Sequence, residues 1–439
     1  MKKTPVDFQI VESKIKESGI KNIGRASIRE LVRLVNNIEG ATGEKFIRME
    51  MGVPGLAPSH IGIEAEIAAL RKGVASIYPD IEGVEALKNE ASRFVKLFLD
   101  VQVSPRSCVP TVGSMQGACA AFMMTGRRDP VKNTTLFIDP GFPVQKQQHR
   151  VLGLPYTGFD VFEFRGARLR DKIKSFLDKG NISAILYSNP NNPAWFCFTE
   201  EELQIIASLA REYDVLVIED LAYFGMDFRQ DYSRPGVPPF QPTIAKYYDQ
   251  YMLLISSSKA FSYAGQRISV MAISDALFGR EFQALIPYFG SPVFGRAMIY
   301  GAVYALSSGT AHSTQYALAA MLKAANDRKF NFVEEVSEYG KKAAVMKKLF
   351  TDHGFRIVYD TDIDRPIADG FYFTLSYPGF TGGELIEELL YYGISAISLD
   401  ITGSEHGEGL RACVSQVQRT QFANLEKRLK KFLEDHPVN

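Results

Sequence analysis

Between about residues 134 and 275, short apolar runs rich in β-branched residues alternate with longer stretches whose apolar residues follow a helical spacing. Runs that are apolar throughout are typical of strands buried on both faces, as in parallel sheets. The alternation therefore predicts strand–helix–strand units and an α/β fold with a mostly parallel, helix-covered sheet. The expected strands are residues 135–138, 183–187, 215–218, 252–255 and 268–273.

After about residue 325 the pattern changes to long amphipathic helices separated by short strands. The chain has 439 residues, which exceeds the roughly 250–300 at which a single hydrophobic core stops growing. We therefore expect a second, smaller α+β domain. The expected helices there are 332–351, 383–392 and 421–434, with a strand at 370–375. The expected parts of the chain are an N-terminal segment that belongs partly to the small domain (1–60), a large domain (61–324) and a C-terminal small domain (325–439).

The composition argues against several classes of protein, namely nucleic-acid-binding, membrane, secreted and cysteine-ligated metal proteins. Lys and Arg total 50, as do Asp and Glu, so the net charge is zero and no global field favours nucleic acid or an anionic membrane. The spacing of the four cysteines forms neither a C-x-x-C pair nor a metal-binding cluster, and predicts buried, reduced thiols. The N-terminus lacks the apolar core of a signal peptide, and no apolar run approaches the ~18 residues of a spanning helix. We expect a cytoplasmic protein with no nucleic-acid or membrane partner.

Reactive side chains follow the expected strands, where parallel α/β sheets bind their ligands. Lys259 comes directly after the strand at 252–255, next to Ser256, and Arg267 lies eight residues further on. Taken alone, such a lysine is more often a surface charge than a nucleophile. Together, hydroxyls, a fixed cation and an amine are the parts of a site for a phosphate-bearing aldehyde.

Three other segments have both a structural and a functional interpretation. Asp220 and Tyr223 follow the strand at 215–218, and a helix N-cap beside a packing tyrosine would also explain them. The segment 187–193, which contains Asn192, is rich in Asn and Pro and would serve equally as a turn. The segment 112–118 is a glycine-containing turn before a helix, which is weak support for an anion site by itself.

In this order and spacing, the segments resemble those of the class I/II aminotransferases, which are fold-type I enzymes dependent on pyridoxal 5'-phosphate (PLP). The resemblance extends over about residues 46–415. It implies a large domain with a mostly parallel, seven-stranded type of sheet, a smaller α+β domain, and PLP as the cofactor. Its most specific part is the series Asn192, Asp220, Tyr223, Lys259, Arg267 and Arg411.

The resemblance implies a role for each residue near the cofactor ring. Lys259 would hold PLP as a Schiff base, the internal aldimine, and would then carry a proton during the reaction. Asp220 would keep the pyridine nitrogen protonated, so that the ring accepts electrons. Asn192 and Tyr223 would bind the 3-oxygen of the ring, and Phe142 would stack on one of its faces.

For the cofactor phosphate, the resemblance points to a helix N-terminus. Gly113, Ser114 and Met115 would offer backbone N–H groups to the anion. Ser256 and Arg267 would complete the cradle, the arginine as a bidentate donor.

The resemblance also implies a homodimer with shared active sites. Tyr78 would reach the phosphate in the neighbouring subunit. The stretch 310–316 would contribute a hydroxyl across the same interface, from either Ser313 or Thr314, whereas His312 fits a packed or solvated residue better than a catalytic one. Arg296 fits a surface role better than a contact with a substrate carboxylate.

The substrate would be held by its α-carboxylate. Arg411 would grip that group as a fork, assisted by Asn192 and the backbone near Gly52. The chain departs from the family where Thr-Gly normally follows the Asn-Pro, because Ala194 and Trp195 stand there instead. We expect this large side chain near the cofactor to affect substrate size or the type of reaction.

The predicted function is transfer of the α-amino group of an L-amino acid to a 2-oxoacid, with 2-oxoglutarate the expected acceptor. One alternative keeps PLP but changes the outcome to β-elimination, as in a C–S lyase, and is motivated by Trp195. A further alternative is a non-catalytic PLP-binding regulator of transcription. The regulator would need a basic DNA-binding module, and the chain carries no net charge and only about 45 residues before the site.

Overall fold

The computed structural model describes residues 3–438, which form two compact units. The large unit comprises Leu56–Asn191 and Cys197–Val336. The small unit comprises the chain up to Gly55, the short segment Asn192–Phe196 and the chain from Ser337 onward. The small unit is therefore built from three separate stretches of sequence. The domain boundaries expected from the sequence stay a prediction.

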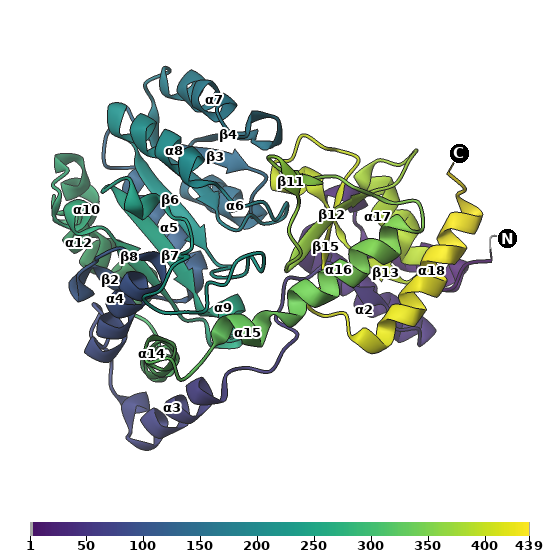
Figure 1. The fold of residues 1–439 in the computed structure, drawn as a ribbon, viewed down its shortest axis with the longest axis horizontal. Helices are drawn as coiled ribbons and strands as arrows, with labels where there is room; N and C mark the ends of the chain where they lie inside the picture. The colour runs from purple at the N-terminus through teal and green to yellow at the C-terminus, as the bar shows by residue number, and fades with distance from the viewer. Residues whose placement is uncertain (1–2, 439) are drawn as a thin grey trace. The chain divides into compact units, whose positions relative to one another are not determined.

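The large unit is organised around a seven-stranded sheet in the order β2-β8-β7-β6-β5-β3-β4 (Figure 1). Its strands are parallel except for β8, which runs antiparallel to both of its neighbours. This confirms the predicted fold class. The strands are β2 (Cys108–Thr111), β3 (Thr134–Asp139), β4 (Tyr156–Asp160), β5 (Ile182–Ser188), β6 (Leu216–Leu221), β7 (Tyr251–Ser256) and β8 (Ser269–Ile273).

All five predicted strands are present, whereas the two edge strands were not predicted. β2 contains Pro110, which cannot donate to a ladder and is tolerated at a sheet edge. β4 contains Gly158 and is only partly buried, so it has no continuous apolar run. β2 is buried along its whole length, but its 4 residues include Pro110 and Thr111 and do not form the continuous apolar run on which the prediction depended.

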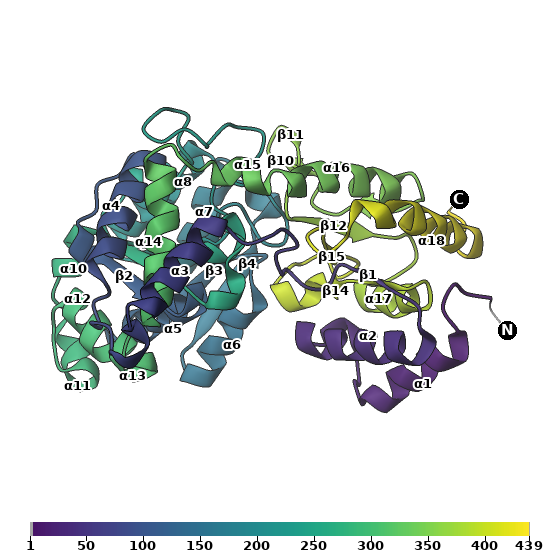
Figure 2. The same cartoon turned by 90° about the horizontal axis from the view of Figure 1, so that it is seen from below.

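Helices cover the sheet of the large unit, and α5 (Gly113–Thr125) lies directly on it. A Cβ at Gly117 would lie 3.2 Å from Cδ2 of Leu254 on β7, so this helix packs closely against the strand that precedes Lys259. Figure 2 shows α14 (His312–Asn326) alongside α3 (His60–Arg71) and α4 (Glu85–Leu99). The other α-helices of the large unit are α6 (Pro143–Leu152), α7 (Arg168–Leu177), α8 (Glu200–Glu212), α9 (Ser257–Ala260), α10 (Asp275–Gly279), α11 (Ile286–Phe289), α12 (Phe294–Ala297), α13 (Tyr304–Ser307) and α15 (Phe332–Val336).

The small unit has α+β architecture, as predicted, with a four-stranded sheet in the order β14-β15-β12-β9. Two further pairs are β1 with β13 and β10 with β11. Helices α1 and α2 lie side by side (Figure 2). The strands are β1 (Ile47–Arg48), β9 (Arg356–Ile357), β10 (Thr361–Asp362), β11 (Arg365–Pro366), β12 (Tyr372–Ser376), β13 (Ile394–Ser395), β14 (Ile397–Ser398) and β15 (Leu410–Cys413). The helices are α1 (Phe8–Ser18), α2 (Ile28–Thr42), α16 (Glu338–Thr351), α17 (Gly382–Tyr391) and α18 (Phe422–Asp435).

The predicted helix at 332–351 is in fact two helices, α15 and α16, separated at Ser337. The break coincides with the boundary between the two units. Ser337 keeps helical backbone angles (φ −60°, ψ −24°), so the apolar periodicity continues through the break and conceals it. Within residues 3–438, no helix combines the length and the apolar character that crossing a bilayer requires.

Candidate active site

Lys259 lies in α9, which begins immediately after β7 at the carboxyl end of that strand. Ser256 caps this short helix, because its Oγ accepts a hydrogen bond from the backbone N–H of Ser258 at 3.1 Å. β6 is the parallel neighbour of β7, and Asp220 pairs with Leu254 in that ladder. The amine and the carboxylate therefore come from the same ends of two adjacent strands, where ligands of parallel sheets bind.

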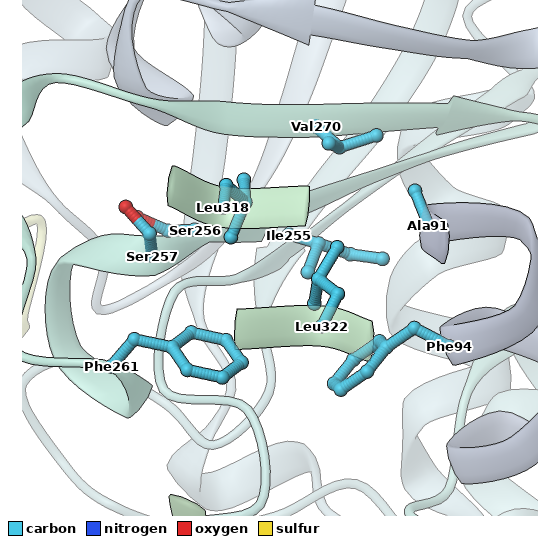
Figure 3. A pocket seen from close by; sticks show the side chains of 9 residues that line it. All are labelled: Ala91, Phe94, Ile255, Ser256, Ser257, Phe261, Val270, Leu318 and Leu322. Carbon is cyan, nitrogen blue, oxygen red and sulfur yellow. The ribbon is translucent and has the colours of Figure 1, made fainter. Parts of the chain in front are cut away.

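A small, mostly apolar cavity lies next to the start of α9 (Figure 3). Its lining is apolar apart from Ser256 and Ser257, so it is not itself a site for a charged ligand. Apolar packing thus supports α9 on this side, together with the hydrogen bond that the Ser257 hydroxyl donates to the carbonyl of Ile268 at 2.6 Å. The lining residues are Ala91, Phe94, Ile255, Ser256, Ser257, Phe261, Val270, Leu318 and Leu322.

Asp220 is a buried carboxylate held by two donors. Its Oδ2 accepts from Nε2 of Gln145 at 2.9 Å, and its Oδ1 accepts from the backbone N–H of Ala222 at 3.1 Å. Burial raises the pKa of Asp220 to about 6, although both hydrogen bonds lower it. At neutral pH the group is therefore mostly ionised but poorly solvated, a state that a cationic partner would stabilise.

Gln145 is a site residue that the sequence analysis missed. It lies on α6, three residues after Phe142, and only 3% of it is exposed. A glutamine in a helix of mixed polarity carries no distinguishing signal. The one hint in the sequence is its position three residues after Phe142, the expected stacking aromatic, because residues three apart lie on the same side of a helix.

The N-terminus of α5 and the side chain of Arg267 lie against each other. Gly113 has a φ of +67°, and a Cβ there would lie only 2.5 Å from Nη2 of Arg267. No side chain caps α5, so the N–H groups of its first turn, which contains Ser114 and Met115, face outward uncapped. A guanidinium beside such a helix end is a site for an anion.

Two side chains beside strands β7 and β8, those of Arg267 and Ser256, complete this anion site, which we call the phosphate cradle. Arg267 has a left-handed φ of +51°, and its Nη1 donates to the carbonyl of Ala264 at 2.9 Å, which fixes the guanidinium. Ser256 pairs with Ser269 on β8, two residues beyond Arg267. Because the Oγ of Ser256 acts as an acceptor toward Ser258, its hydroxyl hydrogen is left to donate to an anion.

The other predicted cofactor contacts of the large unit have different environments. Tyr223 is buried, two residues after β6, and Phe142 is partly buried at the N-cap of α6. Tyr78 is 90% exposed, which leaves its ring available to another molecule. Within the stretch 310–316, the hydroxyl of Ser313 donates to Glu66 and that of Thr314 to the carbonyl of Ala311. The functional roles of these residues stay predictions.

In the small unit, Arg411 on β15 is a buried cation that forms no ion pair with any described residue. Its Nη2 donates to the carbonyl of Glu50 at 2.9 Å and its Nη1 to Oδ1 of Asn192 at 3.4 Å, while Nε has no partner. The Glu50 carboxylate is engaged elsewhere, by Arg48 and Ser395. An unpaired charge in this environment costs several kcal/mol, so the guanidinium requires an anion.

Gly52, the third predicted substrate contact, lies beside Tyr372. A Cβ at Gly52 would lie 1.9 Å from the hydroxyl oxygen of Tyr372, so only glycine fits there. The guanidinium carbon of Arg411 lies 4.4 Å from the centre of the same tyrosine ring. One aromatic side chain thus contacts two of the three predicted substrate-binding residues.

Trp195 is fully buried in the small unit, against Gly370 and Tyr372. Its φ is +69°, the left-handed region that suits glycine, the residue that the family resemblance leads one to expect there. A bulky residue in that region costs about 1–3 kcal/mol. Trp195 contacts the ring of Tyr372, which in turn contacts the guanidinium of Arg411 in the same unit.

The structure therefore groups the predicted residues into two sets. The large unit holds an amine, a buried carboxylate and an anion cradle, and the small unit holds a buried guanidinium in need of an anion. The first set fits PLP, which presents an aldehyde, a basic ring nitrogen and a phosphate. The cradle is the most specific part of this fit, because a side chain at residue 113 would collide with Arg267.

Comparison with known proteins identifies the family of the chain. The sequence model of the family described as "Aminotransferase class I and II" matches residues 44–429. The chain is 24% identical to the Bacillus subtilis protein YugH over 332 residues, which cover 73% of this chain and 78% of that protein. It is 28% identical to the glutamate-pyruvate aminotransferase AlaC of Escherichia coli over 237 residues, 52% of this chain and 54% of the relative.

Solved structures show the same fold. The alanine aminotransferase from Pyrococcus furiosus superposes with a TM-score of 0.76 at 19% identity, covering 94% of this chain and 98% of that one. Because the family model spans most of the sequence, the chain belongs to the class I and II aminotransferases, which are PLP-dependent enzymes.

Proposed function

We propose that this enzyme transfers the α-amino group of an L-amino acid to a 2-oxoacid, with 2-oxoglutarate as the acceptor. The observation that carries the proposal is the buried Arg411, whose positive charge lacks an anionic partner among residues 3–438. Amino acids and 2-oxoacids share a carboxylate next to the reacting carbon, and a carboxylate matches the fork of a guanidinium. One such residue therefore serves both half-reactions.

The chain's own residues divide the work. When bound, PLP supplies the electron sink that stabilises negative charge at the substrate Cα. The amine of Lys259 would hold the cofactor through its aldehyde and would carry the proton at the substrate Cα. Asp220 holds a proton on the ring nitrogen, and Gln145 keeps that carboxylate in place. Arg411 orients the substrate through its carboxylate.

The proposal includes further contacts that follow from the family resemblance. Asn192 and Tyr223 bind the 3-oxygen of the ring, and Phe142 stacks on the ring. Gly113, Ser114, Met115, Ser256 and Arg267 hold the phosphate. The active form is a homodimer in which Tyr78 reaches the phosphate of the partner's site, and the enzyme works in the cytoplasm.

The test is half of the reaction, followed without an acceptor. PLP-loaded protein is mixed with each of the twenty common amino acids, and conversion of the cofactor to pyridoxamine phosphate is measured by absorption and by chromatography after release. We expect conversion with a subset of amino acids and its reversal by 2-oxoglutarate. Release of pyruvate and ammonia from cysteine conjugates, without pyridoxamine phosphate, would instead identify a lyase. No conversion with any amino acid would refute the transaminase assignment.

Replacing Arg411 by lysine should lower kcat/KM by roughly 10²-fold, because a point charge does not reproduce the bidentate fork and the buried site loses donors. The loss should appear for the amino acid and the oxoacid alike, since both present the same carboxylate. Steady-state kinetics on each half-reaction measure it. The control is Arg419→Lys, an exposed arginine paired with Glu338 in the same unit. Equal kinetics in the two variants would contradict the role of Arg411.

Replacing Gln145 by leucine should move the acidic loss of PLP affinity to higher pH. The amide hydrogen bond lowers the pKa of Asp220, so its removal raises that pKa, and the carboxylate is protonated at a higher pH. A protonated carboxyl no longer attracts a protonated ring nitrogen. PLP binding by apo protein is titrated from about pH 5 to about pH 8, a range that extends to both sides of the pKa of about 6 that burial gives Asp220. The phosphate of PLP titrates in the same range, but equally for both proteins.

The matched control for this prediction is Gln147→Leu, which removes an exposed amide from the same helix. It should leave the pH midpoint of PLP binding where the unsubstituted protein has it. A midpoint that is the same in Gln145→Leu as in Gln147→Leu would show that the hydrogen bond to Asp220 has no influence on cofactor capture.

A further inference from the structure

The ring of Tyr372 spans the predicted carboxylate site of the small unit. Its face lies 4.4 Å from the guanidinium carbon of Arg411, and its hydroxyl lies against Gly52. Strands β12 and β15 are antiparallel neighbours, and Thr374 pairs with Arg411. Tyr372, two residues earlier on β12, therefore shares a face of the sheet with Thr374 and is placed to support the arginine.

Hydrogen bonds alone leave the guanidinium of Arg411 loosely held. One of its two bonds is long, at 3.4 Å to Asn192, and Nε has no partner. The bond to the Glu50 carbonyl at 2.9 Å fixes one end only. An aromatic face attracts a cation and restricts it to a plane, and this contact is strongest where water is excluded. The tyrosine ring thus supplies the orientation that the hydrogen bonds do not.

Trp195 in turn holds the tyrosine ring. The two rings meet edge to face, with centroids 6.1 Å apart and an interplanar angle of 70°. The indole occupies the space beside Gly370, where an added Cβ would lie 1.9 Å from its atoms. The tryptophan adopts a φ of +69°, so the backbone is strained to place the indole there. Such strain persists only where the side chain's packing compensates for it.

We propose that Tyr372 is a positioning residue for carboxylate recognition, and that Trp195, seated in the space left by Gly370, keeps the tyrosine ring beneath Arg411. The inference rests on the proposed function, because it assumes that Arg411 binds the substrate carboxylate. It adds a specific arrangement to that function, in which the indole of Trp195 contacts the ring of Tyr372 and that ring contacts the guanidinium of Arg411. This column of three groups orients the plane of the guanidinium that binds the carboxylate.

The test measures carboxylate binding to PLP-loaded enzyme. The probes are 2-oxoglutarate and 3-phenylpropionate, which have no amino group and do not react with the aldehyde form of the cofactor. Dissociation constants come from calorimetry. Trp195 is the only tryptophan of the chain, so its fluorescence reports on the column directly. We expect both carboxylates to change that fluorescence in the unsubstituted protein and not in Arg411→Gln.

Tyr372→Leu should weaken the binding of both carboxylates about tenfold, the scale of a desolvated cation–π contact. Tyr372→Phe, which keeps the ring, should bind them nearly as well as the unsubstituted protein. Gly370→Ala, which touches neither the arginine nor the ligand, should weaken binding by displacing the indole. The double variant Trp195→Phe/Gly370→Ala should recover part of that loss, because the smaller ring frees the space for the new methyl group.

Two results separate the possible failures. Weaker carboxylate binding in Arg411→Gln but not in Tyr372→Leu or Gly370→Ala would overturn the positioning role and leave the proposed function standing. Unchanged binding in Arg411→Gln would overturn the carboxylate site itself. PLP affinity serves as the control for folding, because its cradle lies in the large unit, and a general folding defect would lower it in Tyr372→Leu as well.

Discussion

Lys259→Ala should abolish amino-group transfer, with kcat falling on the order of 10⁴-fold or more, the scale for removal of a reactive catalytic group. The variant lacks the amine that, in the proposed function, binds the cofactor aldehyde and moves the proton at Cα. The pH-sensitive absorption band of the lysine-bound cofactor should be absent. PLP should still bind, without a covalent bond, because the cradle of Gly113, Ser256 and Arg267 is intact.

The matched control is Lys246→Ala, which removes a lysine of the same unit whose amine lies over the ring of Phe240. It should keep both the absorption band and the activity. Activity assays and spectra of the two purified variants decide the matter. A Lys259→Ala protein that keeps the band would show that another amine carries the cofactor.

Asp220→Asn should lower kcat by roughly 10²- to 10⁴-fold, the range for loss of a charge that acts in the transition state. The amide has the shape of the carboxylate but no charge, so it does not keep a proton on the ring nitrogen. PLP affinity should fall as well. Kinetics of the half-reaction and direct titration with PLP measure the two losses.

The same substitution should stabilise the protein when PLP is absent. Burial raises the pKa of Asp220 to about 6, above its value in an unfolded chain. The native state therefore binds the proton more tightly, and this group's contribution to stability decreases as pH rises from about 4 through 6. Above that range the ionised carboxylate destabilises the apo protein by on the order of 2–3 kcal/mol. Apo Asp220→Asn should thus melt above the unsubstituted apo protein at pH 7.

Glu219→Gln is the control for the loss of activity in Asp220→Asn, because Glu219 is the adjacent buried carboxylate of β6. Successive residues of a strand point to opposite faces, and Glu219 accepts from Thr243 Oγ1 at 2.5 Å and from the Ile244 N–H at 3.2 Å. Its glutamine variant should keep PLP affinity and activity. If both variants lost activity equally, the effect would be a general response to a change in the sheet and not a role of Asp220.

The fold was predictable where burial requires a continuous run of apolar residues in the sequence. The central strands β5, β6 and β7 are apolar runs that end in polar residues. β2 and β4 lack such a run. β2 is buried throughout but has only 4 residues and contains Pro110, whereas β4 is partly buried and contains Gly158. The break at Ser337 was hidden because the helical periodicity crosses it.

The candidate site was predictable where a residue type is chemically unusual at its position. A lysine and an aspartate at strand ends attract attention, whereas Gln145 is an ordinary helical residue until its contact with Asp220 is seen. The departure at Trp195 was visible, but its consequence was not. The space that receives the indole is created by Gly370, which is 175 residues away in the sequence, and local patterns carry no information on such pairs.

The origin of the small unit in three stretches of chain has a practical consequence for dissecting the enzyme. A fragment that joins the chain before Leu56 to the chain after Val336 would lack Asn192–Phe196 and, with it, the indole beside Gly370. Such a truncated protein would contain an internal void the size of a tryptophan side chain, for which losses of about 3–5 kcal/mol are typical. An enzyme split into two polypeptides for reassembly should therefore not be divided at Leu56 and Val336. A small unit that is moved into another protein would have to include the segment Asn192–Phe196.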